Sequence, residues 1–174
     1  MDEIEIVKQN SSNKEIVLEE VKKKGVLLEW ASKELQDDKE VVLEAVKQDG
    51  GALEFASDRL KDDKEILLNS LEKVGWVICY ASDRLKDDKE VLLKAAKNDG
   101  QSLYFASQSL RADKEVVLEA VKNKAIILKY ASKELRNDKD VAIAAVTKNK
   151  KSLSYISDEL KKDEDILKIL NPEG

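Results

Sequence analysis

DKEVVLEAVKQDGGALEFASDRLKD, residues 38–62, is the stretch that decides the fold, because the chain repeats its outline six times. The opening Asp-Lys-Glu returns, with few changes, every 25 residues, and an aromatic residue followed by Ala-Ser keeps the same register. The aromatic positions are Trp30, Phe55, Tyr80, Phe105, Tyr130 and Tyr155. Residues 56–65 and 81–90 are identical, which indicates duplication within the gene. Constant spacing without insertion predicts a tandem-repeat protein.

The first half of each unit has the pattern of a short amphipathic helix. Asp38 is expected to cap it, because its carboxylate accepts backbone N–H groups and favours the positive helix end. Apolar residues then follow at helical spacing and form one stripe: Val41, Val42, Ala45 and Val46, widened by Leu43. Gly50 is expected to end the helix in the left-handed cap conformation that glycine adopts easily.

The second half of the unit predicts another helix, residues 51–60, after which Lys61 and Asp62 turn the chain toward the next cap. Each helix has about ten residues and is roughly 15 Å long. Isolated helices of that length are marginal in water. Neighbouring units must therefore stack to bury their apolar stripes, as in a solenoid.

The fold class that follows is all-α: an α-solenoid of six 25-residue helix–turn–helix repeats with short terminal caps. The predicted repeats are residues 13–37, 38–62, 63–87, 88–112, 113–137 and 138–162. Residues 1–12 match the repeat poorly and are assigned to an N-terminal cap. Residues 163–174 are assigned to a C-terminal half-repeat cap, in which Lys168 replaces the apolar residue of the earlier copies.

The phrase Asp-Lys-Glu-Val-Val-Leu-Glu-Ala-Val-Lys, then Gly, then Leu-Glu-Phe-Ala-Ser, resembles a family of short tandem repeats that is catalogued as a domain of unknown function. The resemblance extends over residues 13–170 and implies the repeat fold without bringing catalytic residues. Such repeats occur in bacterial, protist and large-virus proteins. The chain departs from the pattern at four places, namely Asn13, Ala125, Lys150 and Ile156.

Composition narrows the possible partners. The net charge is −5 and the isoelectric point about 5.1, so the chain has no overall attraction to nucleic acid or anionic lipid. No stretch approaches the ~20 apolar residues that span a bilayer, and the acidic start lacks the basic region of a signal peptide. Cys79 is the single cysteine, so no intrachain disulfide forms. We expect a cytoplasmic protein, with a non-classical secretion route as the alternative.

The residues that usually carry catalysis are missing or recur too often. The chain has no histidine, which removes the commonest general base and metal ligand. Paired carboxylates recur at Asp37-Asp38, Asp62-Asp63 and Asp87-Asp88. A glycosidase-like or cation-binding role needs one special pair, so their recurrence favours helix capping. We therefore expect no enzyme, metal, cofactor or small-molecule substrate.

Two other nucleophile types have structural interpretations that we prefer. The recurring serines, Ser32 through Ser157, are expected to be small residues with a hydrogen bond inside a helix, because no activating base accompanies them. Cys79 is expected to be a small, partly buried residue. The alternative, a reactive redox thiol, requires a lowered pKa that a sequence does not reveal.

Three positions of the second helix vary between copies and form what we call the variable strip. The first position holds Val26, Gly51, Trp76, Gln101, Ile126 and Lys151. The second holds Glu29, Glu54, Cys79, Tyr104, Lys129 and Ser154. The third holds Lys33, Asp58, Asp83, Gln108, Lys133 and Asp158. Spacings of three and four residues place these positions on one helical face.

The middle of the variable strip carries large apolar residues beside charges, which favours partner binding. The residues expected to bind a partner are Trp76, Cys79, Tyr104, Ile126, Lys129 and Lys133. The alternative is that Trp76 and Ile126 pack at the turn between helices.

We expect a non-catalytic protein–protein interaction or scaffold protein with a protein partner. A secreted effector or a phage-type inhibitor that binds a specific macromolecule is a more specific version of this hypothesis. A helical repeat that binds single-stranded nucleic acid is a second alternative, against which the acidic charge argues. A passive structural part of a larger assembly is a third.

Overall fold

The computed structural model describes residues 2–171 and confirms the all-α class, with helices and no strand in that range. Residues 172–174 of the predicted C-terminal cap, and Met1, lie outside the described residues. The chain divides into two compact units, residues 1–85 and 86–174. The division falls inside the third predicted repeat, within the short helix α7 (Asp83–Lys86).

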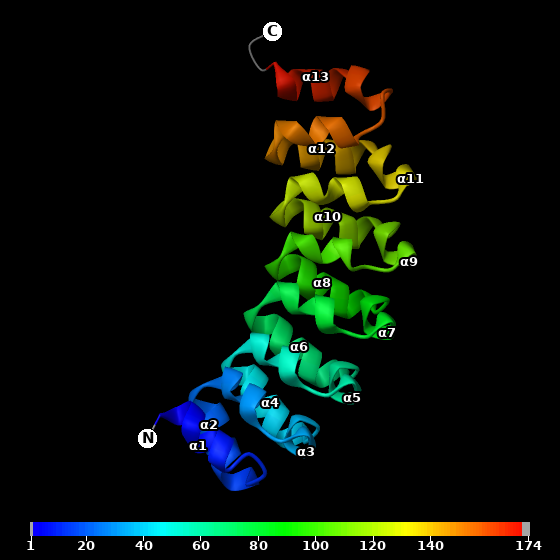
Figure 1. The fold of residues 1–174 in the computed structure, drawn as a ribbon. Helices are drawn as coiled ribbons and strands as arrows, with labels where there is room; N and C mark the ends of the chain where they lie inside the picture. Colours follow the sequence, from blue (N-terminus) through cyan, green and yellow to red (C-terminus); the bar gives the residue numbers. More distant parts are fainter. Residues whose placement is uncertain (1, 172–174) are drawn as a thin grey trace. The chain divides into compact units, whose positions relative to one another are not determined.

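Unit 1 contains long α-helices, 3-10 helices (labelled η) and one-turn α-helices in regular succession (Figure 1). They are α1 (Glu3–Gln9), α2 (Lys14–Lys23), η1 (Gly25–Trp30), α3 (Lys33–Gln36), α4 (Lys39–Gln48), η2 (Gly50–Phe55), α5 (Asp58–Lys61), α6 (Lys64–Lys73) and η3 (Gly75–Tyr80). The long helices α2, α4 and α6 lie side by side, and η1, η2 and η3 form a second row against them.

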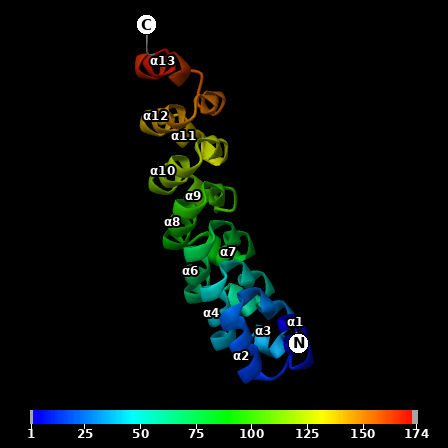
Figure 2. The same cartoon turned by 90° about the vertical axis from the view of Figure 1, so that its left-hand side faces the viewer.

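Unit 2 repeats the same succession. Its elements are α8 (Lys89–Asn98), η4 (Gly100–Tyr104), α9 (Gln108–Arg111), α10 (Lys114–Asn123), η5 (Ala125–Tyr130), α11 (Lys133–Arg136), α12 (Lys139–Lys148), η6 (Lys150–Tyr155), η7 (Leu160–Lys162) and α13 (Glu164–Leu170). Figure 2 shows the long helices on one side and the shorter elements on the other within each unit. Each unit is thus a two-layered, solenoid-like stack.

The core confirms the predicted apolar stripe. Val41, Val42, Ala45 and Val46 on α4 are fully buried, and Leu43 is half-buried beside them. The facing η2 buries Ala52 and Leu53 completely, and Leu60 on α5 closes the layer. The 3-10 helices η1 and η2 in unit 1, and η4 and η5 in unit 2, each pack on the long helix of their own repeat and on that of the next, so the repeats within a unit bury one another's stripes.

The predicted second helix, residues 51–60, is wrong as one element. The structure places a 3-10 helix at Gly50–Phe55 and a one-turn α-helix at Asp58–Lys61. Ala56 and Ser57 between them are extended, with ψ near 155° and 158°. The Ser57 backbone N–H donates to the Gln36 carbonyl of the previous repeat at 2.9 Å, so the break serves the stacking of repeats.

The predicted left-handed glycine cap is also wrong, since no described residue has a positive φ. The helix α4 ends at Gln48, and the extended Asp49 leads into η2. Buried Gly50 and its counterparts are small because the next long helix comes close: a Cβ on Gly100 would lie 2.5 Å from the Ala120 carbonyl oxygen. Close approach, and not conformational freedom, explains these glycines.

Candidate protein-binding surface

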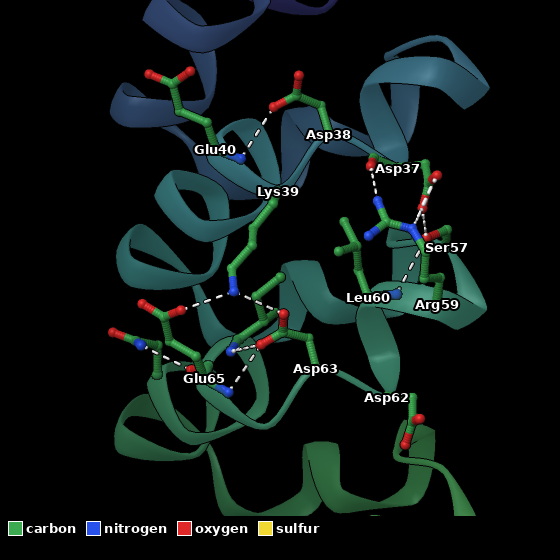
Figure 3. A network of polar contacts seen from close by, with 12 residues as sticks. Asp37, Asp38, Lys39, Glu40, Ser57, Arg59, Leu60, Asp62, Asp63 and Glu65 are labelled. Carbon is green, nitrogen blue, oxygen red and sulfur yellow. Dashed lines mark hydrogen bonds and ion pairs between the residues drawn. The ribbon is translucent and has the colours of Figure 1, made fainter.

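On one side of each unit, a row of ion pairs links the long helices of successive repeats, and we call it the ionic ladder. The Lys39 ammonium lies 2.8 Å from Asp63 and 2.9 Å from Glu65 (Figure 3). The same lysine position forms the same pair of contacts at Lys14 in unit 1 and at Lys89, Lys114 and Lys139 in unit 2. Every charge of the ladder therefore has an opposite charge beside it, although each lysine with its two carboxylates keeps one net negative charge.

The second carboxylate of each pair caps a long helix, as predicted. Asp63 accepts the backbone N–H groups of Glu65 at 3.0 Å and Ile66 at 3.3 Å. Burial raises the pKa of the Asp63 carboxyl, but the Lys39 ammonium and the backbone donors outweigh it and hold that pKa below its usual range.

The side chain of the first carboxylate does not cap the N-terminus of a long helix, which corrects the prediction. Asp37 accepts hydrogen bonds from the Ser57 hydroxyl and, at 3.0 Å, from Arg59 Nε (Figure 3). These two donors hold the pKa of Asp37 below its usual range. Both donors belong to the next repeat, so Asp37 joins neighbouring repeats.

The serines also differ from the prediction, because their hydroxyls are not bonded inside a helix. Ser57 is the N-cap of α5 and accepts the Leu60 N–H at 3.3 Å while it donates to Asp37. The hydroxyls of Ser82 and Ser107 likewise donate to Asp62 and Asp87. Because each of these hydroxyls already donates its hydrogen bond to a carboxylate, the contacts of these serines are structural.

The sequence carries a signal for this contact that the repeat comparison overlooked. An Asp before the long helix is followed 22 residues later by Arg or Ser, as in Asp37–Arg59, Asp62–Arg84 and Asp87–Ser109. Where the position before the long helix is uncharged, the residue 22 positions later is Glu, as in Ser12–Glu34, Ala112–Glu134 and Asn137–Glu159. Neighbouring repeats thus avoid placing two carboxylates together.

The variable strip occupies the side of each repeat formed by the 3-10 and one-turn helices. Its first two positions share a face, because residues three apart eclipse each other in a 3-10 helix. The third position begins the following one-turn helix in the first five copies and lies in a turn at Asp158, so the three positions do not lie on one continuous helix as predicted. Trp76 and Tyr104 expose 45% and 51% of their surface, while Ile126 and Cys79 are half-buried.

In unit 1 the aromatic part of the strip adjoins a shallow groove. Trp76 meets Tyr80 edge to face, with ring centroids 5.9 Å apart. The Lys61 ammonium lies 5.7 Å from the centre of the Tyr80 ring, and the Glu54 carboxylate acts on the Tyr80 phenol. Burial and Glu54 together raise the pKa of Tyr80. The groove, about 500 Å³, is lined by Glu29, Lys33, Gln36, Glu54, Phe55, Ala56, Ser57, Asp58 and Lys61.

Unit 2 has its own aromatic cluster. The Tyr104 ring lies 5.0 Å from both Phe105 and Tyr130, edge to face in each case. The Lys129 ammonium lies 4.7 Å from the centre of the Tyr130 ring. A second groove, about 610 Å³, is lined by Lys133, Glu134, Arg136, Asn137, Tyr155, Ile156, Ser157, Asp158 and Glu159.

The structure thus groups the predicted residues by unit. Trp76 and Cys79 lie on η3 in unit 1, with Trp76 next to Tyr80. Tyr104 and Lys129 meet through Tyr130 in unit 2. The packing partners Tyr80 and Tyr130 were not predicted as part of the surface, because they belong to the position that is aromatic in every copy.

Two further features, metal-binding clusters and membrane-spanning helices, are absent from the described part of the chain. Residues 2–171 hold no group of three or more histidine, cysteine or acidic side chains placed to bind a metal ion. In the same range no helix has the length and apolar character needed to cross a membrane.

Stacked repeats, an ionic ladder and an exposed aromatic strip define the class: an all-α, solenoid-like tandem-repeat protein. The model of the family described as "Domain of unknown function (DUF4116)" matches residues 13–61, 38–78, 63–111 and 113–161. The chain belongs to this family, and the resemblance seen in the repeat is confirmed. No curated protein and no solved structure matches the chain.

Proposed function

We propose that the protein binds another protein through the variable strip and catalyses no reaction. The observation that carries this proposal is the exposure of Trp76 and Tyr104 at two strip positions. Among described residues the large apolar side chains that are exposed are Trp76, Tyr104 and Leu167. Trp and Tyr are the residues most often found as anchors of protein interfaces.

The geometry around these anchors supports the proposal. Each aromatic ring is held by an edge-to-face neighbour, Tyr80 for Trp76 and Tyr130 for Tyr104. A ring that is already held loses little conformational freedom when a partner covers it. The grooves beside the strip offer a polar rim, which interfaces also have.

We also place the protein in the cytoplasm. The support for this is the single half-buried Cys79, which suits a reducing compartment because no intrachain disulfide is needed.

The test is a pull-down from the native cell with wild-type protein and with the double variant Trp76→Ala/Tyr104→Ala. Leu167→Ala is the matched control, because Leu167 is 42% exposed but lies on α13, away from the strip. We expect the double variant to lose the captured protein and the control to retain it, with unchanged circular dichroism in both. Equal capture by all three proteins, or unfolding of the double variant, would refute the proposal.

A further inference from the structure

The variable strip carries charges of opposite sign in the two units. In unit 1 its charged residues are Glu29, Lys33, Glu54, Asp58 and Asp83, of which all but Lys33 are acidic. In unit 2 they are Lys129, Lys133, Lys151 and Asp158, of which all but Asp158 are basic. The whole units follow the same trend: residues 1–85 hold 13 basic and 20 acidic side chains (net −7), and residues 86–174 hold 18 and 16 (net +2).

The majority charges on the strip form no ion pair within residues 2–171, unlike those of the ionic ladder. The acidic groups Glu29, Asp58 and Asp83 have no cation within ion-pair distance, and neither Lys133 nor Lys151 has a carboxylate. The minority charges do have polar partners: Asp158 pairs with Lys161 at 2.7 Å, and Lys33 donates to Gln36 at 2.8 Å. The charged side chains of the strip that form no ion pair are therefore acidic in unit 1 and basic in unit 2.

Each of these charged surfaces also has one exposed aromatic anchor. Trp76 connects to the acidic side through Tyr80, whose phenol is influenced by the Glu54 carboxylate. Tyr104 connects to the basic side through Tyr130, over which Lys129 lies. A partner that matches both surfaces must itself present a basic aromatic surface and an acidic aromatic surface.

We propose that this partner is a second copy of the chain, with the acidic strip of unit 1 in one copy docked on the basic strip of unit 2 in the other. The inference rests on the proposed function, because it names the protein that the strip binds. The charge complementarity between the two surfaces is its support, since opposite charges steer association and fix register. Exposed ion pairs are screened by salt, so the association weakens as ionic strength rises.

The repeat supplies substitutions that its own fold already accepts. Glu54 and Asp58 of the second copy occupy the same positions as Lys129 and Lys133 of the fifth. The acid-to-base variant is Glu54→Lys/Asp58→Lys, and the base-to-acid variant is Lys129→Glu/Lys133→Asp. The control is Lys22→Glu/Lys148→Glu, which changes net charge as much as the base-to-acid variant but lies on the exposed last turns of α2 and α12.

Sedimentation velocity and light scattering, up to about 100 µM protein, measure association at about 20 mM and about 500 mM salt. We expect the wild type and the control to associate at low salt and to dissociate at high salt. Each strip variant alone should associate at least roughly tenfold more weakly. An equimolar mixture of the two should recover wild-type association, because each then meets its opposite charge.

A wild type that stays monomeric at every concentration would overturn the inference, as would strip variants that associate like the control or a mixture that fails to recover. These results are distinct from failure of the proposed function. A monomeric protein that captures another protein through Trp76 and Tyr104 keeps the proposed function and excludes the second copy as partner.

Discussion

At Gly50 the side chain is a single hydrogen, and the carbonyl of Ser70 in the next repeat occupies the space that a methyl group would need. The Ser70 hydroxyl donates to the Gly50 carbonyl at 2.5 Å, so a hydrogen bond also joins the two repeats at this close approach. The adjacent Gly51 faces more open space, where a Cβ would meet Asp49 Oδ1 at 3.2 Å and Trp76 Cζ2 at 3.9 Å. Of these two neighbouring glycines, only Gly50 lies where the packing of the next repeat leaves no space for a Cβ.

We expect Gly50→Ala to lower the free energy of unfolding by about 1–3 kcal/mol, because the added methyl overpacks against a backbone carbonyl. Ala125 occupies this position in the fifth copy, so we expect the stack to adjust and not to unfold. Gly51→Ala should change the free energy by less than about 1 kcal/mol, because only a flexible side chain must yield. Urea unfolding of both variants measures the difference, and equal losses would contradict this account.

At the scale of elements, the sequence was sufficient for the 25-residue period, the apolar stripe of α4 and the Asp cap, because each depends on residues close in the chain. The break at Ala56 and Ser57 was not predictable from periodicity, since residues 51–60 also fit a helix. It arises from contacts 20 and 21 residues away, the Ser57 hydroxyl on Asp37 and the Ser57 N–H on the Gln36 carbonyl. At this place the contacts with the previous repeat outweighed the local preference for a helix.

The junction between the fourth and fifth repeats offers a test of how elements are joined. Ala112 stands where three other copies have Asp, and Glu134 stands where two other copies have Arg. Ala112→Asp alone should destabilise the protein, because it sets a carboxylate against Glu134. Ala112→Asp/Glu134→Arg should recover the loss by recreating the Asp37–Arg59 contact, and should melt about 2 °C above the single variant. Thermal melts of the two variants, with Glu134→Arg as control, measure this recovery. If the change in melting temperature of the double variant equals the sum of the changes of the two single variants, the contact is excluded.

For the candidate surface, the strip residues followed from comparing copies, but their neighbours did not. Tyr80 and Tyr130 occupy a position that is aromatic in every copy, so variation did not mark them. Their ring contacts with Trp76 and Tyr104 depend on how one repeat lies on the next. Variation identifies the residues that differ between copies and misses the constant ones that support them.

The dependence of the stability of the whole molecule on pH follows from two sets of side chains whose pKa values differ from their usual ones. Carboxylates such as Asp37 and Asp62 have a folded pKa below 3.8, so they stabilise the fold above that value and lose this contribution as pH falls through the folded pKa. Lysines such as Lys39 and Lys114 have a folded pKa above 10.5, so they stabilise the fold below that value and lose this contribution as pH rises. The chain has no histidine to titrate between these limits.

We therefore expect the urea midpoint to stay nearly constant between about pH 5 and 8 and to fall below about pH 4. A series of urea titrations across this range measures it. A marked change of midpoint between pH 5 and 7 would show that a group other than these carboxylates and lysines controls stability.

The hydrogen bonds and ion pairs that join neighbouring repeats connect residues 20 to 26 positions apart in the chain. These contacts, among residues 2–171, need no distant part of the polypeptide, so forming them closes only short loops as the chain orders. A tandem copying event of one period adds a layer that brings its own lysine, serine and carboxylate. Evolution can therefore lengthen such a protein in whole steps while every older linkage keeps its geometry.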